Sequence, residues 1–271
     1  MNPNFDQMRL PIGVNVDLAH SDAKDTSVWT GGRRKAEALL PTWRSEIDRL
    51  QELFYADARR GLLVILQGMD TSGKDGIIRH VFEGVNPQGV RVSSFKQPTP
   101  EELAHDFLWR IHRDAPARGE IVIFNRSHYE DVLVARVHHL VPHKVWSKRF
   151  DAINAFEHEL VDEGNSILKF FLHISREEQA RRLQDRIDDP TKRWKLNLAD
   201  FHERRYWDEY QAAYEDVLER TNTAWAPWYL LPSDHKWFRN LAISFILVEF
   251  LKGLKLRYPE PKISVASLKL H

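Results

Sequence analysis

One loop of this sequence combines the residue types that bind phosphate. The segment Gly68-Met-Asp-Thr-Ser-Gly-Lys-Asp75 fits the pattern Gly-x-x-x-x-Gly-Lys. In such loops the glycines let backbone N–H groups point at one anion, the lysine reaches the transferred phosphate, and the following helix adds its positive dipole end. A chance match of so short a string is the alternative. We expect phosphate to be bound by Gly68, Thr71, Ser72, Gly73, Lys74 and Asp75.

Two carboxylates in this loop indicate a divalent cation. Asp75 stands where a serine or threonine hydroxyl usually ligates magnesium, and Asp70 lies inside the loop. Two negative groups beside a polyanion repel it unless a cation lies between them. The sequence therefore predicts Mg²⁺, with Mn²⁺ as a possibility, held by Asp70 and Asp75 with Asp131 as a further ligand. The alternative for Asp75 is an acid in the first turn of a helix, where the dipole favours it.

A second polar cluster follows an apolar strand candidate at 121–124. Asn125, Arg126, Glu130 and Asp131 come directly after this strand. The carboxyl ends of parallel strands face one crevice, so these side chains are expected beside the phosphates. Arg126 would neutralise charge, while Glu130 or Asp131 would ligate metal or orient an incoming phosphate oxygen. The alternative is a solvated turn whose acids only cap the next helix.

A basic region at 181–195 suggests a lid. Arg182 and Arg186 are four residues apart and therefore share one face of a predicted helix. Two guanidinium groups on one face suit closure over phosphates. Ordinary surface pairing is the alternative, and it is the interpretation we favour for Arg181 with Asp185.

The elements needed to position these groups alternate along the chain. Apolar runs predict strands at 61–67, 90–95, 121–124, 167–174 and 228–231. Helical spacing predicts helices at 33–58, 74–84, 142–163, 199–221 and 236–256, with further helices opening at 100 and 176. Strand and helix in alternation predict an α/β fold, in which a five-stranded parallel sheet lies between helices.

Composition narrows the class of protein. The chain has 271 residues, 42% of them hydrophobic, which is enough for one domain with a modest insertion. Its 39 basic and 39 acidic residues balance, which argues against a nucleic-acid partner. The absence of cysteine excludes disulfides and thiol chemistry. We also expect neither a signal peptide nor a membrane span, and therefore a cytoplasmic protein.

Six motifs in order resemble the polyphosphate kinase 2 family across about residues 30 to 255. They are Gly68–Gly76, Gly84–Val92, Ser94–Pro98, Phe124–Val132, Phe171–Ser175 and Ala226–Tyr229. The resemblance implies a P-loop kinase fold with a helical lid, in a cytoplasmic homo-oligomer, a tetramer or dimer. It also implies reversible, magnesium-dependent phosphoryl transfer between inorganic polyphosphate and a nucleotide.

The resemblance also assigns roles to residues. Asp70 would position the acceptor phosphate through metal, Lys74 would bind the transferred phosphate, and Asp75 would support the metal or the lysine. The expected catalytic residues are Asp70, Lys74, Arg126 and Asp131, and Arg182 and Arg186 belong to the lid. The expected nucleotide-binding residues are Asn125, Arg126, Tyr129, Glu130 and Lys195.

The second motif also suggests which acceptors are used. Family members restricted to diphosphates tend to read Asp-Arg-Ser-Trp-Tyr-Asn there, whereas this chain reads Asn125-Arg-Ser-His-Tyr-Glu130. The variant resembles the subgroup that phosphorylates both mono- and diphosphates, so AMP, ADP and ATP, or their guanine equivalents, are the expected nucleotides. The alternatives are an ATP-dependent nucleotide kinase, an NTP-binding regulator and a non-catalytic polyphosphate-binding protein.

We divide the chain accordingly. Residues 1–30 are predicted to form an N-terminal arm, 31–258 the kinase domain with a lid at about 176–205, and 259–271 a C-terminal tail.

Overall fold

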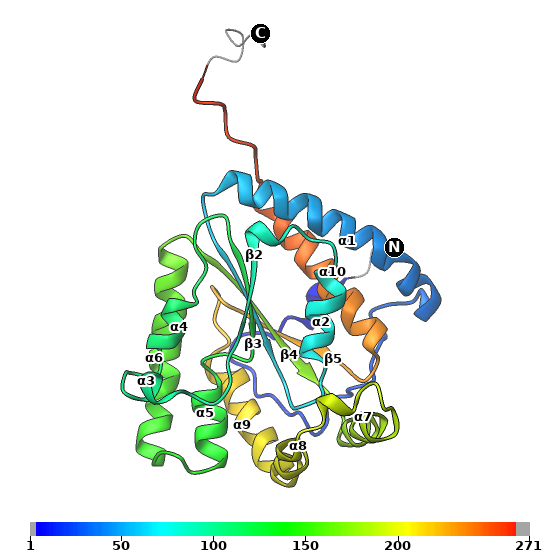
Figure 1. Cartoon of the computed structure of the whole chain (residues 1–271), viewed down its shortest axis with the longest axis vertical. Helices are drawn as coiled ribbons and strands as arrows, with labels where there is room; N and C mark the ends of the chain where they lie inside the picture. The colour runs from blue at the N-terminus through cyan, green and yellow to red at the C-terminus, as the bar shows by residue number, and fades with distance from the viewer. Residues whose placement is uncertain (1–3, 264–271) are drawn as a thin grey trace.

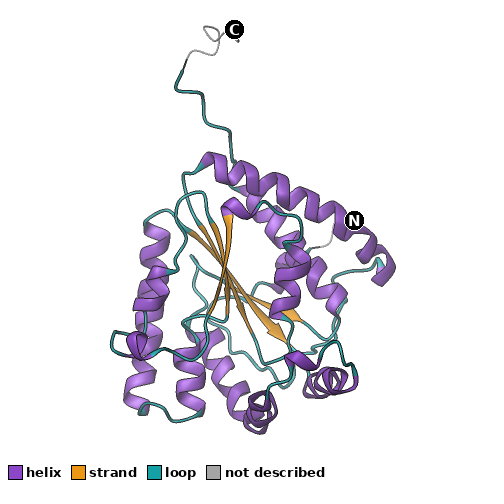
Figure 2. Ribbon diagram, in the orientation of Figure 1, coloured by secondary structure: helices purple, strands orange, loops and turns teal. Residues whose placement is uncertain are grey.

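The centre of the protein is a sheet of five parallel strands. A computed structural model of the chain describes residues 4–263, and its strands lie in the order β2-β3-β1-β4-β5 (Figures 1 and 2). Every residue of β1 is buried, as expected of a strand covered on both faces. The predicted α/β fold with a five-stranded parallel sheet is therefore confirmed.

Strands and α-helices alternate along residues 4–263, with some helices in succession. In chain order they are α1 (Gly32–Asp57), β1 (Leu62–Gln67), α2 (Lys74–Val81), β2 (Val90–Ser94), α3 (Pro100–Leu103), α4 (Trp109–Arg113), β3 (Ile121–Asn125), α5 (Glu130–Val137), α6 (His143–Asp162), β4 (Ser166–His173), α7 (Arg176–Asp188), α8 (Leu198–Glu203), α9 (Trp207–Arg220), β5 (Trp228–Pro232) and α10 (Lys236–Gly253). Short 3₁₀ turns lie at Phe5–Met8, Pro87–Gly89, Arg193–Lys195 and Arg204–Tyr206.

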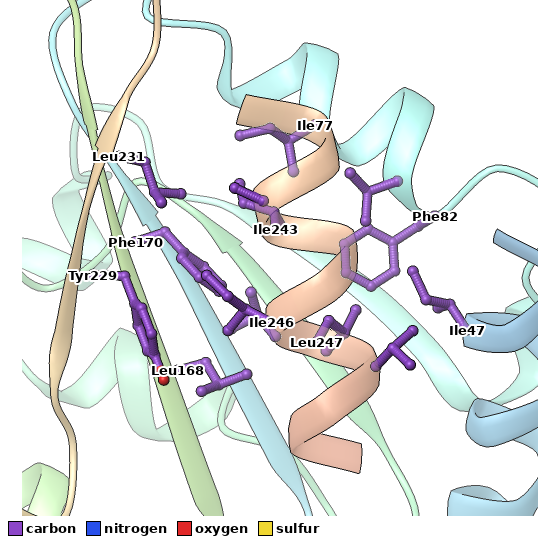
Figure 3. Packing of buried hydrophobic residues seen from close by; sticks show 14 of the residues in the cluster. Ile47, Ile77, Phe82, Leu168, Phe170, Tyr229, Leu231, Ile243, Ile246 and Leu247 are labelled. Atoms are coloured by element: carbon purple, nitrogen blue, oxygen red, sulfur yellow. The ribbon is translucent and has the colours of Figure 1, made fainter. Parts of the chain in front are cut away.

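Alternating side chains of β1 belong to two separate hydrophobic cores, one on each face of the sheet. Leu62, Val64 and Leu66 face α1, α2 and α10, whereas Leu63 and Ile65 face α5, α6 and α9. Figure 3 shows the first core, where residues of α10 interleave with residues of the sheet and α2. Because both faces are covered by helices, polar groups collect at the ends of the strands, where the loops lie.

The lid region differs from the single helix predicted at 199–221. The structure divides that stretch into α8, a 3₁₀ turn at Arg204–Tyr206, and α9. In Figure 1, α7 and α8 lie beyond the end of the sheet to which β4 points. The break lets the chain turn from the lid back against the sheet.

The N-terminal segment is bound to the sheet rather than free. Phe5 and Leu18 are buried, and Arg9 pairs with Tyr229 of β5 in an isolated antiparallel bridge. At the other end, residues up to 263 extend away from the domain, and the rest of the predicted tail lies outside the described residues. Within residues 4–263 no helix combines the length and apolarity that crossing a membrane requires.

Candidate active site

The phosphate loop joins β1 to α2 and depends on unusual backbone angles. Gly68 and Gly73 have φ angles of +145° and +111°, which residues with a Cβ rarely adopt. Thr71 also lies in the left-handed region, with φ of +65°. Glycine adopts such angles without strain, whereas the angle at Thr71 is strained, and strained residues concentrate at functional sites because the surrounding structure must enforce them. The two glycines therefore allow this loop shape, and the surrounding structure holds Thr71 in it.

Lys74, the first residue of α2, lies inside this loop. Its Nζ donates to the carbonyl oxygens of Gly68 at 2.6 Å and Met69 at 3.3 Å. Burial, and then the charge of Arg126, lower the pKa of Lys74, while Asp70, Glu130 and Asp75 act to raise it. An ammonium group has three donors, so one remains for a phosphate oxygen.

The two predicted motifs meet at the carboxyl ends of β1 and β3. Asn125 is in register with Leu66, and its Nδ2 donates to Oδ1 of Asp75 at 2.7 Å. Arg126, with φ of +62°, donates from Nη2 to Oδ1 of Asp70 at 2.6 Å. The nearby Glu130 carboxylate is the main cause of the raised pKa of Arg126, so this arginine stays charged. The structure thus brings Asn125 and Arg126 against the loop, where the strand order had predicted them.

Glu130 lies close enough to Lys74 and Arg126 for its charge to act on both. It is the first residue of α5, and burial raises its pKa. Its Oε1 accepts a hydrogen bond from Nε2 of Gln67 at 3.2 Å. Gln67 was missed by the sequence analysis, although a signal existed, because it is the one amide side chain in an otherwise apolar strand run.

Arg182 does not occupy the position predicted for a lid arginine. Five hydrogen bonds use all five of its N–H donors: one to Glu178, and one each to the carbonyl oxygens of Thr71, Ser72, Ser233 and Asp234. Only 5% of the residue is exposed. The prediction that Arg182 binds phosphate is wrong for this structure, because the side chain braces the back of the loop and has no donor left.

Arg186 and Lys195 lie in the region at about 176–205 that was predicted to form a lid. Arg186 donates from Nη1 to Oδ2 of Asp200 at 2.8 Å and to the carbonyl oxygen of Lys195 at 3.2 Å. Burial, and then the charge of Asp70, raise the pKa of Asp200, so this part of the lid lies within electrostatic reach of the loop. The Lys195 side chain is exposed, with its Nζ 5.1 Å from the ring centroid of Trp194.

Tyr129 lies in the interior and not at the crevice. Its side chain is fully buried, its hydroxyl donates to Oε1 of Glu157 at 2.6 Å, and it accepts from Nζ of Lys169 at 3.0 Å. A nucleotide bound at the surface cannot reach this hydroxyl, so the predicted nucleotide contact is wrong. The sequence did not indicate this, because the hydrogen-bond partners of Tyr129 come from α6 and β4.

Asp131 also points away from the loop. Its carboxylate is 3.5 Å from Nη2 of Arg110 and 3.4 Å from Nη1 of Arg149, and its backbone carbonyl accepts a second bond from Arg149. Among residues 4–263 no hydrogen bond or ion pair joins Asp131 to the phosphate loop. We therefore drop Asp131 from the expected catalytic and metal-binding residues.

Asp70 and Asp75 are the carboxylates that remain for a metal ion. Each accepts one hydrogen bond from the opposite motif, and each lies beside Lys74 in the loop. In residues 4–263, no three histidine, aspartate or glutamate side chains are grouped so as to hold a metal unaided. Mg²⁺ is commonly held by one or two carboxylates together with substrate phosphates and water. The donor set thus fits a metal that arrives with its phosphate ligand.

Comparison with known proteins identifies the family. The family model described as polyphosphate kinase 2 matches residues 32–259. The chain is 54% identical over 246 residues to an AMP/ADP-polyphosphate phosphotransferase of Meiothermus ruber, covering 91% of this chain and 92% of that relative. It is 44% identical over 266 residues to an ADP-polyphosphate phosphotransferase of Rhodopseudomonas palustris, covering 94% and 92%.

A solved structure extends the agreement to the fold. The crystal structure of polyphosphate kinase 2 from Arthrobacter aurescens matches with a TM-score of 0.93 and 42% identity, over 97% of this chain and 93% of that one. The predicted kinase fold is therefore confirmed. Since motifs, sequence and fold agree, this protein belongs to the polyphosphate kinase 2 family.

Proposed function

We propose that this protein transfers the terminal phosphate of inorganic polyphosphate to AMP and to ADP, and that the transfer is reversible. The observation that carries the proposal is the contact between the two motifs, in which Arg126 binds Asp70 and Asn125 binds Asp75. On this basis we infer that the loop binds the donor and that the residues following β3 bind the acceptor beside it. The relative from Meiothermus ruber, which is named for both acceptors, supports the use of both.

In the proposed reaction the terminal phosphate of polyphosphate lies over the loop. Lys74 and the backbone N–H groups at the start of α2 bind its oxygens. An oxygen of the acceptor's terminal phosphate attacks the phosphorus, and the bond to the bridging oxygen breaks. The shortened polyphosphate leaves with the electron pair of that bond. Positioning and charge supply the catalysis, so no covalent enzyme intermediate is needed.

We further propose that Asp70 and Asp75 hold Mg²⁺ or Mn²⁺ together with the phosphates. The ion would neutralise the charge that builds up between donor and acceptor. Occupation of Asp70 by a cation would release Arg126 from its present ion pair, so that its guanidinium can contact the acceptor phosphate. Arg186 and Lys195 of the lid are the further cations proposed to contact phosphates and nucleotide.

Glu130 is proposed to set the number of phosphates on the acceptor. It lies near Lys74 and Arg126, accepts a hydrogen bond from Gln67, and stands where diphosphate-specific members tend to carry asparagine. Glu130→Asn is expected to lower kcat/KM for AMP more than for ADP. An unchanged ratio of the two values would contradict this role.

The test of the proposed function is a set of incubations without ATP. Polyphosphate and MgCl₂ are combined with AMP, ADP, GMP or GDP separately, and products are separated by ion-exchange chromatography. We expect ADP and then ATP to form from AMP. Lys74→Ala and Asp70→Asn should each abolish transfer while the circular dichroism spectrum is unchanged, and near-normal turnover in both would refute the assignment.

A parallel incubation separates the rival enzyme. ATP and AMP are supplied without polyphosphate, and ADP formation is followed. An ATP-dependent nucleotide kinase would be active here and inactive with polyphosphate alone, whereas the proposed enzyme shows the reverse. A non-catalytic polyphosphate-binding protein would form no nucleotide product in either incubation. An NTP-binding regulator with slow hydrolysis would form ADP from ATP slowly, whether or not AMP is present, and would form none from polyphosphate and AMP.

We also propose a homo-oligomer, a tetramer or dimer, working in the cytoplasm, where the nucleotide pool lies. Support comes from the family resemblance and from exposed apolar side chains, including Leu140 and Val145, which are 65% and 43% exposed. Light scattering after gel filtration tests the oligomer, and cell fractionation tests the location.

A further inference from the structure

A buried arginine from the last helix lies directly behind the phosphate loop. Arg239 is in the first turns of α10, a helix that contacts α2 (Figure 1), and only 2% of the residue is exposed. Its Nη1 donates to the carbonyl oxygen of Ser72 at 2.7 Å. A Cβ added to Gly73 would overlap this guanidinium, so the loop and the arginine are packed against each other.

The charge of Arg239 has no acidic partner. Its remaining hydrogen bonds, from Nε at 3.3 Å and Nη2 at 3.0 Å, go to the neutral amide oxygen of Asn240. No carboxylate within residues 4–263 forms an ion pair with it, and the charge that contributes to its pKa shift is the like charge of Arg182. Burial, and then Arg182, lower the pKa of Arg239 to about 9, so the cation persists at neutral pH.

Arg182 lies behind the same loop but, unlike Arg239, has an acidic partner. Both arginines donate to the same Ser72 carbonyl oxygen, but Arg182 is paired with Glu178 at 2.7 Å. The Ser72 carbonyl would therefore keep one donor if Arg239 were removed. Hydrogen bonding to the Ser72 carbonyl does not by itself require a second cation that lacks an acidic partner. Burying such an unpaired charge costs free energy, because the charge loses its hydration.

We propose that Arg239 is a positioning residue whose unpaired charge is compensated by the phosphate chain that binds on the other side of the loop. This rests on the proposed binding of polyphosphate over Lys74. In a buried setting the attraction between the guanidinium and a polyanion is screened little by water. Burying the unpaired cation costs free energy in the free protein, and binding of the donor offsets that cost. The affinity for the donor and the position of the loop therefore both depend on this side chain.

The test measures binding without catalysis. Tripolyphosphate is titrated in the presence of Mg²⁺ and absence of nucleotide, by calorimetry and by thermal unfolding, into wild type, Arg239→Met, Arg239→Lys and Lys252→Met. Lys252→Met is the matched control, because Lys252 lies at the far end of the same helix and is half exposed. Arg239→Met removes the charge but keeps much of the volume.

We expect Arg239→Met to raise the Kd about tenfold or more, whereas the melting temperature of the unliganded variant stays level or rises. We expect Arg239→Lys, which keeps the charge, and Lys252→Met to remain within about threefold of wild type. In the transfer assay the KM for polyphosphate should rise in Arg239→Met, while the KM for AMP stays unchanged.

Different negative results of this binding test would refute different parts of the proposal. If wild type does not bind tripolyphosphate, the proposed donor site at the loop is refuted. If wild type binds and Arg239→Met binds equally well, the role of Arg239 is refuted. A lower melting temperature in Arg239→Met with unchanged Kd would show bracing alone. Should Arg239→Met fail to fold, Arg239→Lys decides, and a tenfold loss of affinity in it would overturn the role of charge.

Discussion

Replacing Arg182 by alanine tests whether this arginine supports the phosphate loop from behind or contacts phosphate as part of a lid. In Arg182→Ala the carbonyl oxygens of Thr71, Ser233 and Asp234 lose their guanidinium donor, whereas Ser72 keeps Arg239. A buried acceptor left without a donor costs about 1–3 kcal/mol, so three of them cost about 3–5 kcal/mol once water reaches the vacated space. At about 2–4 °C per kcal/mol, the melting temperature should fall by roughly 6–20 °C.

Urea denaturation, followed by tryptophan fluorescence and by circular dichroism, measures this loss. The matched control is Arg181→Ala on the same helix, because Arg181 is 55% exposed and pairs only with Glu178 and Asp185. We expect the control to lose less than about 1 kcal/mol. Coincident transitions by the two probes establish that one free energy of unfolding describes each variant.

Two results would refute the brace. One is an Arg182→Ala protein within about 1 kcal/mol of wild type, since that is the size expected for an exposed ion pair. The other is normal stability combined with weakened binding of tripolyphosphate, which is the behaviour of an arginine that contacts phosphate in a lid. The second result would also restore the interpretation that the spacing of Arg182 and Arg186 first suggested.

Three further predictions concern neighbouring residues. Tyr129→Phe removes a buried hydroxyl bound to the Glu157 carboxylate, so unfolding should become about 1.5–3 kcal/mol easier in urea while the KM for AMP is unchanged. Although burial opposes it, hydrogen bonds from two arginines lower the pKa of Glu178 from its usual 4.5 to about 2. The stability difference between wild type and Glu178→Gln should therefore be full above pH 4.5 and vanish as pH falls to about 2 in acid titrations of unfolding. Gly73→Ala forces a Cβ onto the Arg239 guanidinium at a left-handed φ, and should abolish transfer in the nucleotide assay even where the protein folds; activity near wild type would show that the loop tolerates the shift.

Much of the fold could be predicted because its signals are local. The apolar run at 61–67 becomes β1, and the capping box at Thr99 begins α3. Burial of a whole strand on both faces requires a continuous apolar run, and a phosphate loop requires its glycines, so both leave marks within a few residues. The proximity of Asn125 to the loop also followed from sequence, since parallel strands end at one edge.

Side-chain direction was decided by tertiary packing. Helical spacing put Arg182 and Arg186 on one face, but only the packing of α7 against the loop determined that Arg182 is buried and Arg186 faces Asp200. Tyr129 stands between Arg126 and Glu130, yet its partners on α6 and β4 draw it inward.

The sequence by itself determined that a phosphate loop follows a buried strand and that a polar wall stands at the next strand. It contained no sign that Arg239, 167 residues beyond Ser72, lies behind that loop. Local sequence encodes backbone shape, because hydrogen bonding and steric limits act between near neighbours. The charge behind the loop depends on how α10 packs across the sheet against α2, a contact that exists only in the folded protein.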